Sequence, residues 1–150
     1  MRLTQHTDYG LRMLIYLALL GEERGTIREI SERYGISRNH LMKVGHHLQQ
    51  LGYVEGVRGK GGGLSLALAP EEIPLGQLVR DMEPDLIIAE CFGPDNHCVI
   101  TPHCNLRFYL NEALQAFLDT LDQYSLADIS APEASALRQD LGIRWRPRKA

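Results

Sequence analysis

All three cysteines of the 150-residue sequence lie in one short stretch, from Cys91 to Cys104. Six residues separate Cys91 from Cys98, and five separate Cys98 from Cys104. Glycine and proline within the stretch exclude a regular helix. Thiolates gathered on one loop are suitable ligands for zinc or for an iron-sulfur cluster. Both kinds of site usually have four ligands, so the stretch lacks one.

The expected compartment agrees with metal binding. The longest apolar run, Met13 to Leu20, is too short to span a bilayer, and the N-terminus lacks the regions of a signal peptide. We therefore expect a cytoplasmic protein without membrane contact. In a reducing cytosol, an odd number of clustered cysteines is more often metal-binding or redox-active than part of a disulfide framework.

Charge is distributed unevenly along the chain, although the formal net charge is only -3. Residues 1–70 hold nine Lys or Arg and six Asp or Glu, whereas residues 71–130 hold two and eleven. Residues 131–150 hold five and two. A basic first half on an acidic chain predicts that any contact with a polyanion is local to that half.

The first half has the pattern of a helix-turn-helix. An apolar helix is expected over 8–20, with Thr7 or Asp8 as its cap. Thr26 and Glu29 form a capping box for a second helix that ends at Gly35, and Ser37 caps a third helix that runs to about Leu51. Leu41, Val44, Leu48 and Leu51 form the inward face of that third helix. Its outward face is polar, and in this motif such a face enters the major groove.

A wing is expected directly after the third helix. Two strand-like segments, 52–58 and 64–69, flank the glycine-rich residues 59–63, which require positive backbone dihedrals. A basic, slender hairpin tip can lie along the DNA backbone or reach into the minor groove. The residues assigned to DNA contact are Thr26, Ser37, Arg38, Asn39, His40, Lys43, Arg58, Lys60 and Gly61, with His46 or His47 also facing outward. The alternative is an ordinary solvated polar face.

The second half is expected to position the cysteines and join two subunits. A short helix spans 73–83, and a long helix over 105–124 carries an apolar stripe of Leu106, Leu110, Ala113, Phe117, Leu121 and Tyr124. The stripe suggests a homodimer, and packing on the 13–20 helix is the competing interpretation. The predicted fold is mostly α with a small β-hairpin wing. Its expected parts are a winged helix-turn-helix domain (1–83), a cysteine loop (84–104), a dimerisation helix (105–128) and a solvated C-terminal extension (129–150).

Several separate motifs, in order, resemble the dimeric winged-helix iron-sulfur regulators over roughly residues 1–130. They are LT at 3–4, TDYGLR at 7–12, SRNH at 37–40, VRGKGGG at 57–63, EP at 83–84, CVITPHC at 98–104 and YSLAD at 124–128. The resemblance is greatest to the nitric-oxide-sensing members of that family. The branch that regulates cluster assembly uses a histidine three residues after the third cysteine, where this chain has Arg107.

The resemblance implies that Cys91, Cys98 and Cys104 bind a [4Fe-4S] or [2Fe-2S] cluster, and that Asp8 of the partner subunit is the fourth ligand. From the residues alone, a capping role at a helix N-terminus is favoured for Asp8, and it is the resemblance that favours a ligand instead. His97 or His103 could instead complete a zinc site.

The implied function is a homodimeric transcriptional repressor that binds palindromic promoter DNA and releases it when nitric oxide attacks the cluster. It is not expected to be an enzyme. The alternatives are an iron-sulfur or redox-responsive regulator of the cluster-assembly branch, a zinc-stabilised DNA-binding protein and an electron carrier. The wing and the lack of a nucleotide-binding motif disfavour the electron carrier.

Overall fold

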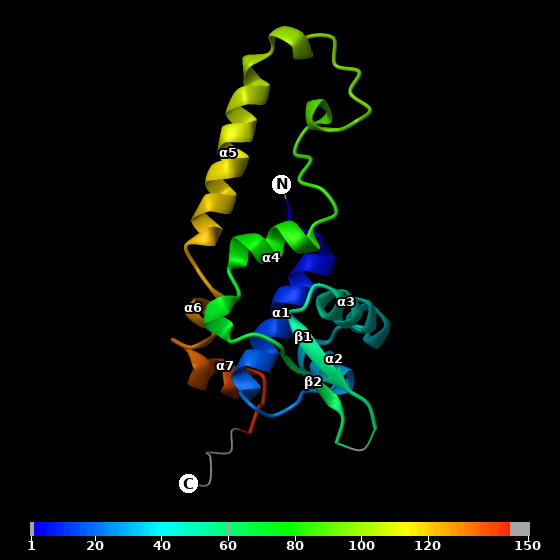
Figure 1. Ribbon diagram of the computed structural model, residues 1–150, viewed down its shortest axis with the longest axis vertical. Coiled ribbons are helices and arrows are strands. Elements are labelled where there is room, and N and C mark those ends of the chain that lie inside the picture. Colours follow the sequence, from blue (N-terminus) through cyan, green and yellow to red (C-terminus); the bar gives the residue numbers. More distant parts are fainter. Residues whose placement is uncertain (1, 60, 145–150) are drawn as a thin grey trace.

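A long helix projects from a small winged-helix body in the computed structural model, which describes residues 2–59 and 61–144 (Figure 1). The helices and strands are α1 (Gln5–Leu20), α2 (Ile27–Tyr34), α3 (Arg38–Gln50), β1 (Val54–Val57), β2 (Gly63–Leu66), α4 (Leu75–Met82), α5 (Asn105–Asp122), α6 (Leu126–Ser130) and α7 (Ala134–Asp140). Short 3-10 turns lie at Pro70–Glu72, Glu90–Phe92 and Thr101–His103. The expected fold class, mostly helical with one hairpin, is confirmed.

Helix α1 lies at the centre of the body, where Met13, Leu14 and Leu17 are fully buried. Its N-cap is Thr4, whose Oγ1 accepts a hydrogen bond from the Thr7 amide at 3.2 Å. The prediction that Thr7 or Asp8 caps this helix is therefore wrong, because the helix begins earlier and both residues lie within its first turns. The amide of Thr4 also donates to Glu83 Oε1 at 2.9 Å.

The helix-turn-helix has the predicted caps. The Thr26 hydroxyl accepts from the Glu29 amide and the Glu29 carboxylate accepts from the Thr26 amide, which completes the capping box. Gly35 ends α2 in the left-handed conformation at φ 65°, and Ser37 caps α3. The predicted inward face of α3 is confirmed at Leu41, Val44 and Leu48. It is wrong at Leu51, which caps the end of the helix and is exposed.

The wing is a two-stranded antiparallel hairpin in which Val54 pairs with Leu66 and Val57 pairs with Gly63. Two further hydrogen bonds join Leu64 to Gly25, at 2.9 and 2.8 Å. Strand β2 of the wing is thus fixed beside the residue that precedes the N-cap of α2. At its tip Gly59 and Gly61 have φ of 93° and 78°, which confirms the predicted positive dihedrals at these two positions.

Helix α5 packs on α4 through its C-terminal half only. Leu114 and Leu118 are buried against Val79 of α4, and Arg80 makes two hydrogen bonds of 2.7 Å with the Asp122 carboxylate. The N-terminal half stands away from the body beside the cysteine loop (Figure 1). There Leu106, Phe108 and Tyr109 are more than half exposed. The residues buried on α4 are thus not those of the predicted stripe, in which Phe117 and Leu121 are only partly buried and Leu106 and Tyr124 are exposed.

The C-terminal segment returns to the body. Leu141 and Ile143 pack against the main core, and Arg138 Nε of α7 donates to the Leu19 carbonyl of α1 at 2.9 Å. Within the described ranges, no helix is both long and apolar enough to cross a membrane.

Candidate nucleic-acid interface and cysteine loop

The outward face of α3 presents the side chains that the sequence assigns to DNA. Arg38, Asn39, His40 and Lys43 are all exposed. Ser37 is exposed as well, but its Oγ accepts from the His40 amide at 3.2 Å, so its hydroxyl stabilises the start of the helix. The first turn of α3 therefore offers a cluster of amide, imidazole and cationic donors suited to base edges and phosphates.

His46 and His47 differ in environment. His46 is exposed, whereas His47 is partly buried and its Nδ1 lies 2.9 Å from His6 Nε2 of α1. Burial lowers the pKa of His6, the charge of His47 lowers it further, and Glu83 opposes the change. Of the two histidines left open by the sequence, His46 faces outward and His47 joins α3 to α1.

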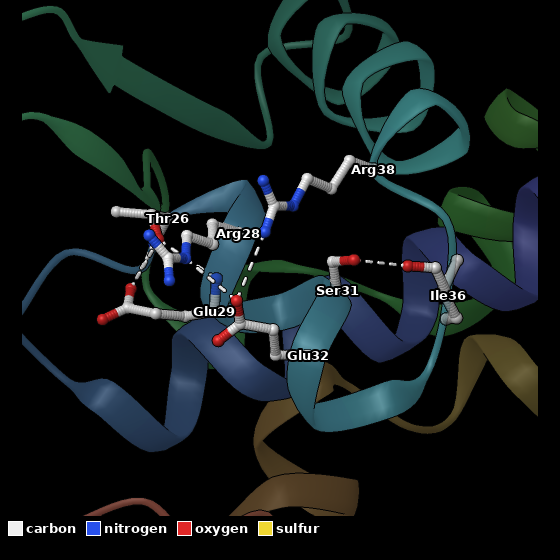
Figure 2. A network of polar contacts seen from close by, with 7 residues as sticks. All are labelled: Thr26, Arg28, Glu29, Ser31, Glu32, Ile36 and Arg38. Carbon is white, nitrogen blue, oxygen red and sulfur yellow. Dashed lines mark hydrogen bonds and ion pairs between the residues drawn. The ribbon is translucent and has the colours of Figure 1, made fainter.

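A polar network crosses the turn between α2 and α3 (Figure 2). Glu32 Oε1 accepts from Arg28 Nε at 2.9 Å and from Arg38 Nη2 at 3.3 Å. The hydrogen bond from Arg28 lowers the pKa of Glu32, and Arg38 lowers it further, so the carboxylate stays ionised at neutral pH. The hydroxyl of Ser31 donates to the Ile36 carbonyl at 2.6 Å and holds the turn closed.

The wing supplies a second candidate contact. Arg58 and Gly61 are exposed at its tip, and Lys60 lies outside the described residues. Between the wing and the N-terminus of α2 lies an open groove of about 330 Å³, lined in part by Thr26, Gln49 and Arg58. The structure thus places Thr26 and Arg58 on one groove, although the Thr26 hydroxyl is already used in the capping box.

The cysteine loop carries three free, partly exposed thiols. It is ordered by its own hydrogen bonds: Asn96 accepts from the Cys98 amide at 3.1 Å and also bonds Thr101, while Glu90 accepts from the His97 amide at 2.8 Å. Its base is held by Glu83, which binds Thr4. At the beginning of α5, the Arg107 guanidinium lies 5.9 Å from the centre of the Phe92 ring.

The donor set fits an iron-sulfur cluster in chemistry, because three thiols without disulfide partners share one loop. In one chain, however, the ligands are not assembled. Among the described residues, no three His, Cys, Asp or Glu side chains form a group that could hold a metal ion. Asp8 lies on α1 and its carboxylate binds Arg12, with Oδ2 2.8 Å from Arg12 Nη2. His97 and His103, the alternative zinc ligands, are exposed.

Two residues of these sites were missed by sequence reasoning. Glu32 lies four residues after Arg28, a spacing that indicates an ion pair on one helix, but its contact with Arg38 depends on the turn. Glu83 is 79 residues from Thr4, and no local pattern connects them.

Comparisons with known proteins agree on one class. Residues 3–132 match the Rrf2 family model, described as an iron-dependent transcriptional regulator. The "HTH-type transcriptional regulator NsrR" of Bacillus subtilis (strain 168) is 53% identical over 131 residues, which cover 86% of this chain and 90% of that protein. Its namesake in Bacillus licheniformis is 51% identical over 131 residues, covering 86% and 92%.

Solved structures show the same fold. CymR (YrzC), the global cysteine regulator of B. subtilis, has a TM-score of 0.71 and 23% identity, with 87% of this chain and 97% of that chain covered. T. potens IscR has a TM-score of 0.69 and 22% identity, with 98% and 94% covered.

Proposed function

The chain belongs to the Rrf2 family of transcriptional regulators, and on this basis we propose that it is a repressor that binds palindromic promoter DNA as a homodimer and releases it in response to nitric oxide. The chain is a regulator rather than an enzyme, as the sequence predicted. The observation that carries the DNA-binding part is the exposed polar face of α3, on a helix-turn-helix whose wing is fixed beside it.

Each element has a proposed role in DNA binding. Arg38, Asn39 and Lys43 reach base edges and phosphates in the major groove, because the first turns of the second helix of this motif enter that groove. Arg58 and Lys60 follow the phosphate backbone from the wing. The exposed apolar side chains on the N-terminal half of α5 pair with a second copy. Two-fold symmetry then presents two α3 helices to a palindromic site.

The proposed cofactor is a [4Fe-4S] or [2Fe-2S] cluster held by Cys91, Cys98, Cys104 and Asp8 of the partner subunit. When bound, it supplies iron that nitric oxide can attack. The family description as iron-dependent supports use of a metal.

Helix α1 offers a physical route from the loop to the DNA-binding face. It carries Asp8, its N-cap Thr4 binds Glu83 at the base of the loop, and its His6 contacts His47 of α3. A change at Asp8 that shifts α1 would thus act on both contacts. Because half-site spacing must match the helical repeat of DNA, a small shift of α3 in each subunit is sufficient to weaken binding.

The test combines spectroscopy with DNA binding. Protein purified without oxygen should absorb visible light, contain iron and acid-labile sulfide, and bind a site selected from a randomised duplex pool. Nitric oxide should bleach that absorption and lower affinity for the selected duplex. A colourless protein with stoichiometric zinc and full DNA affinity would refute the cluster proposal, and a response to oxidants but not to nitric oxide would favour a redox-responsive regulator.

A further inference from the structure

We propose that Glu32 is a specificity-determining residue of the DNA-binding face, because it holds the Arg38 guanidinium in place at the start of α3. Glu32 itself is on α2, outside the set of residues assigned to DNA contact. The inference rests on the proposed function, since it concerns how a DNA-binding side chain is oriented. It goes beyond that function by assigning sequence discrimination to an acidic residue that would be repelled by phosphate.

The contacts across the turn support this role. One carboxylate oxygen of Glu32 accepts from Arg28 and from Arg38, so a single acidic group fixes two guanidinium groups, one from each helix of the motif. Figure 2 shows the Arg38 side chain reaching back from α3 toward Glu32. The Ser31 hydroxyl, on the same helix as Glu32, donates to the Ile36 carbonyl, so the backbone of the turn is restrained as well.

The contact with Glu32 reduces the conformational freedom of the Arg38 side chain before DNA binds. An unrestrained arginine on a helix surface has many rotamers, and recognition of a base edge selects one of them. A carboxylate that accepts from one guanidinium nitrogen limits these rotamers and leaves the other nitrogens to donate. Orientation is therefore provided by the protein rather than by DNA. Discrimination between bases depends on that geometry, whereas phosphate attraction does not.

The charge of Glu32 leads to a different expectation for overall DNA affinity than for base discrimination. Glu32 is exposed on α2 next to Arg38 of the proposed interface, where its negative charge would repel phosphate. Removing its charge should leave affinity for an unrelated duplex unchanged or increase it. Loss of discrimination together with undiminished nonspecific binding therefore distinguishes a positioning role from general damage to the interface.

The experiment uses the full chain and the duplex site selected from a randomised pool, with each base pair of the site then changed singly. Arg38→Ala identifies the base pair at which Arg38 discriminates. Glu32→Gln should reduce discrimination at that same base pair by about tenfold. The double variant, Glu32→Gln with Arg38→Ala, should lose no more discrimination than Arg38→Ala alone, because both changes act through the Arg38 side chain.

Two controls separate the effect from helix stability and from net charge. Arg28→Gln removes the other partner of Glu32 but leaves the Arg38 contact, so discrimination should remain. Glu71→Gln removes the same charge from an exposed position in the Pro70–Glu72 turn, outside the proposed DNA and dimer interfaces, and should change neither quantity.

The outcomes are distinct. Unchanged discrimination in Glu32→Gln, or a uniform gain in affinity with discrimination retained, overturns the inference. A wild-type chain that selects no duplex overturns the proposed function itself, and with it the role of Glu32.

Discussion

Replacing Asp8 by alanine is expected to impair the cluster while leaving the fold intact. Within the described residues the Asp8 carboxylate forms an ion pair with Arg12, and both side chains are more than two-fifths exposed. Such a pair stabilises a helix by about 0.3–0.5 kcal/mol. Alanine recovers a similar amount through its helix propensity, about 0.5 kcal/mol. The N-cap at Thr4 is unaffected, so the melting temperature of the cluster-free protein should stay within about 2 °C of wild type.

In contrast to the small change in melting temperature, Asp8→Ala should change the cluster's absorption spectrum markedly. If Asp8 is a ligand, the variant should show an altered visible spectrum, lower iron content and a changed response to nitric oxide. Arg12→Ala is the matched control, because it breaks the same ion pair and keeps the carboxylate. Equal spectra and equal nitric oxide responses for Asp8→Ala and the wild type would refute the assignment.

Mixed dimers test which subunit supplies the carboxylate. A dimer that combines an Asp8→Ala chain with a Cys98→Ala chain contains one complete site only if Asp8 serves the partner's cysteines. Such dimers should bind about half of the wild-type iron, because one of the two symmetry-related sites is complete. If Asp8 served its own chain, neither site would be complete and the iron would be lost.

Three further predictions concern the other elements. Lys60→Ala should weaken binding to all duplexes alike and reduce the salt slope by about one, as measured by fluorescence anisotropy over a salt series; an effect on one sequence alone would contradict the proposed role of the wing. Leu118→Ala should lower the free energy of unfolding by about 2–5 kcal/mol in urea denaturation, because Leu118 is buried against α4; a loss below 1 kcal/mol would mean that the α4–α5 contact is not tightly packed. Phe108→Ser should shift sedimentation from dimer toward monomer with an unchanged helical spectrum, because the ring is exposed on the free half of α5; a dimer of wild-type affinity would exclude this part of α5 from the interface.

The helix-turn-helix could be predicted because its signals are local. Thr26 and Glu29 lie three residues apart and satisfy each other's amides, and Gly35 and Ser37 mark the turn whatever the rest of the chain does. The start of α1 was less certain because Thr4, Thr7 and Asp8 are all good capping residues within one turn. Tertiary contact with Glu83 accompanies the cap at Thr4.

The apolar pattern of α5 was predicted, but its covered side was not. The spacing of apolar residues predicts an apolar face on the helix, but it does not show which element packs against that face. Leu114, absent from the predicted stripe, is buried on α4, whereas Leu106 is exposed. The site has the same limit. The cysteines were identified by type and spacing, while the gathering of ligands and the contact of Glu32 with Arg38 depend on elements brought together by folding.

Helix α1 is hydrogen-bonded near both ends to residues that are synthesised much later than the helix itself. Thr4 binds Glu83, 79 positions along the chain, and the Leu19 carbonyl accepts from Arg138, 119 positions away. At ribosomal speed the second interval takes roughly ten seconds to synthesise. The nascent helix has its apolar face from the start, but it lacks the first hydrogen bond until Glu83 is made and the second until Arg138 is made. The helix that carries Asp8 therefore leaves the ribosome well before α7, and its contact with Arg138 can form only after α7 has been translated.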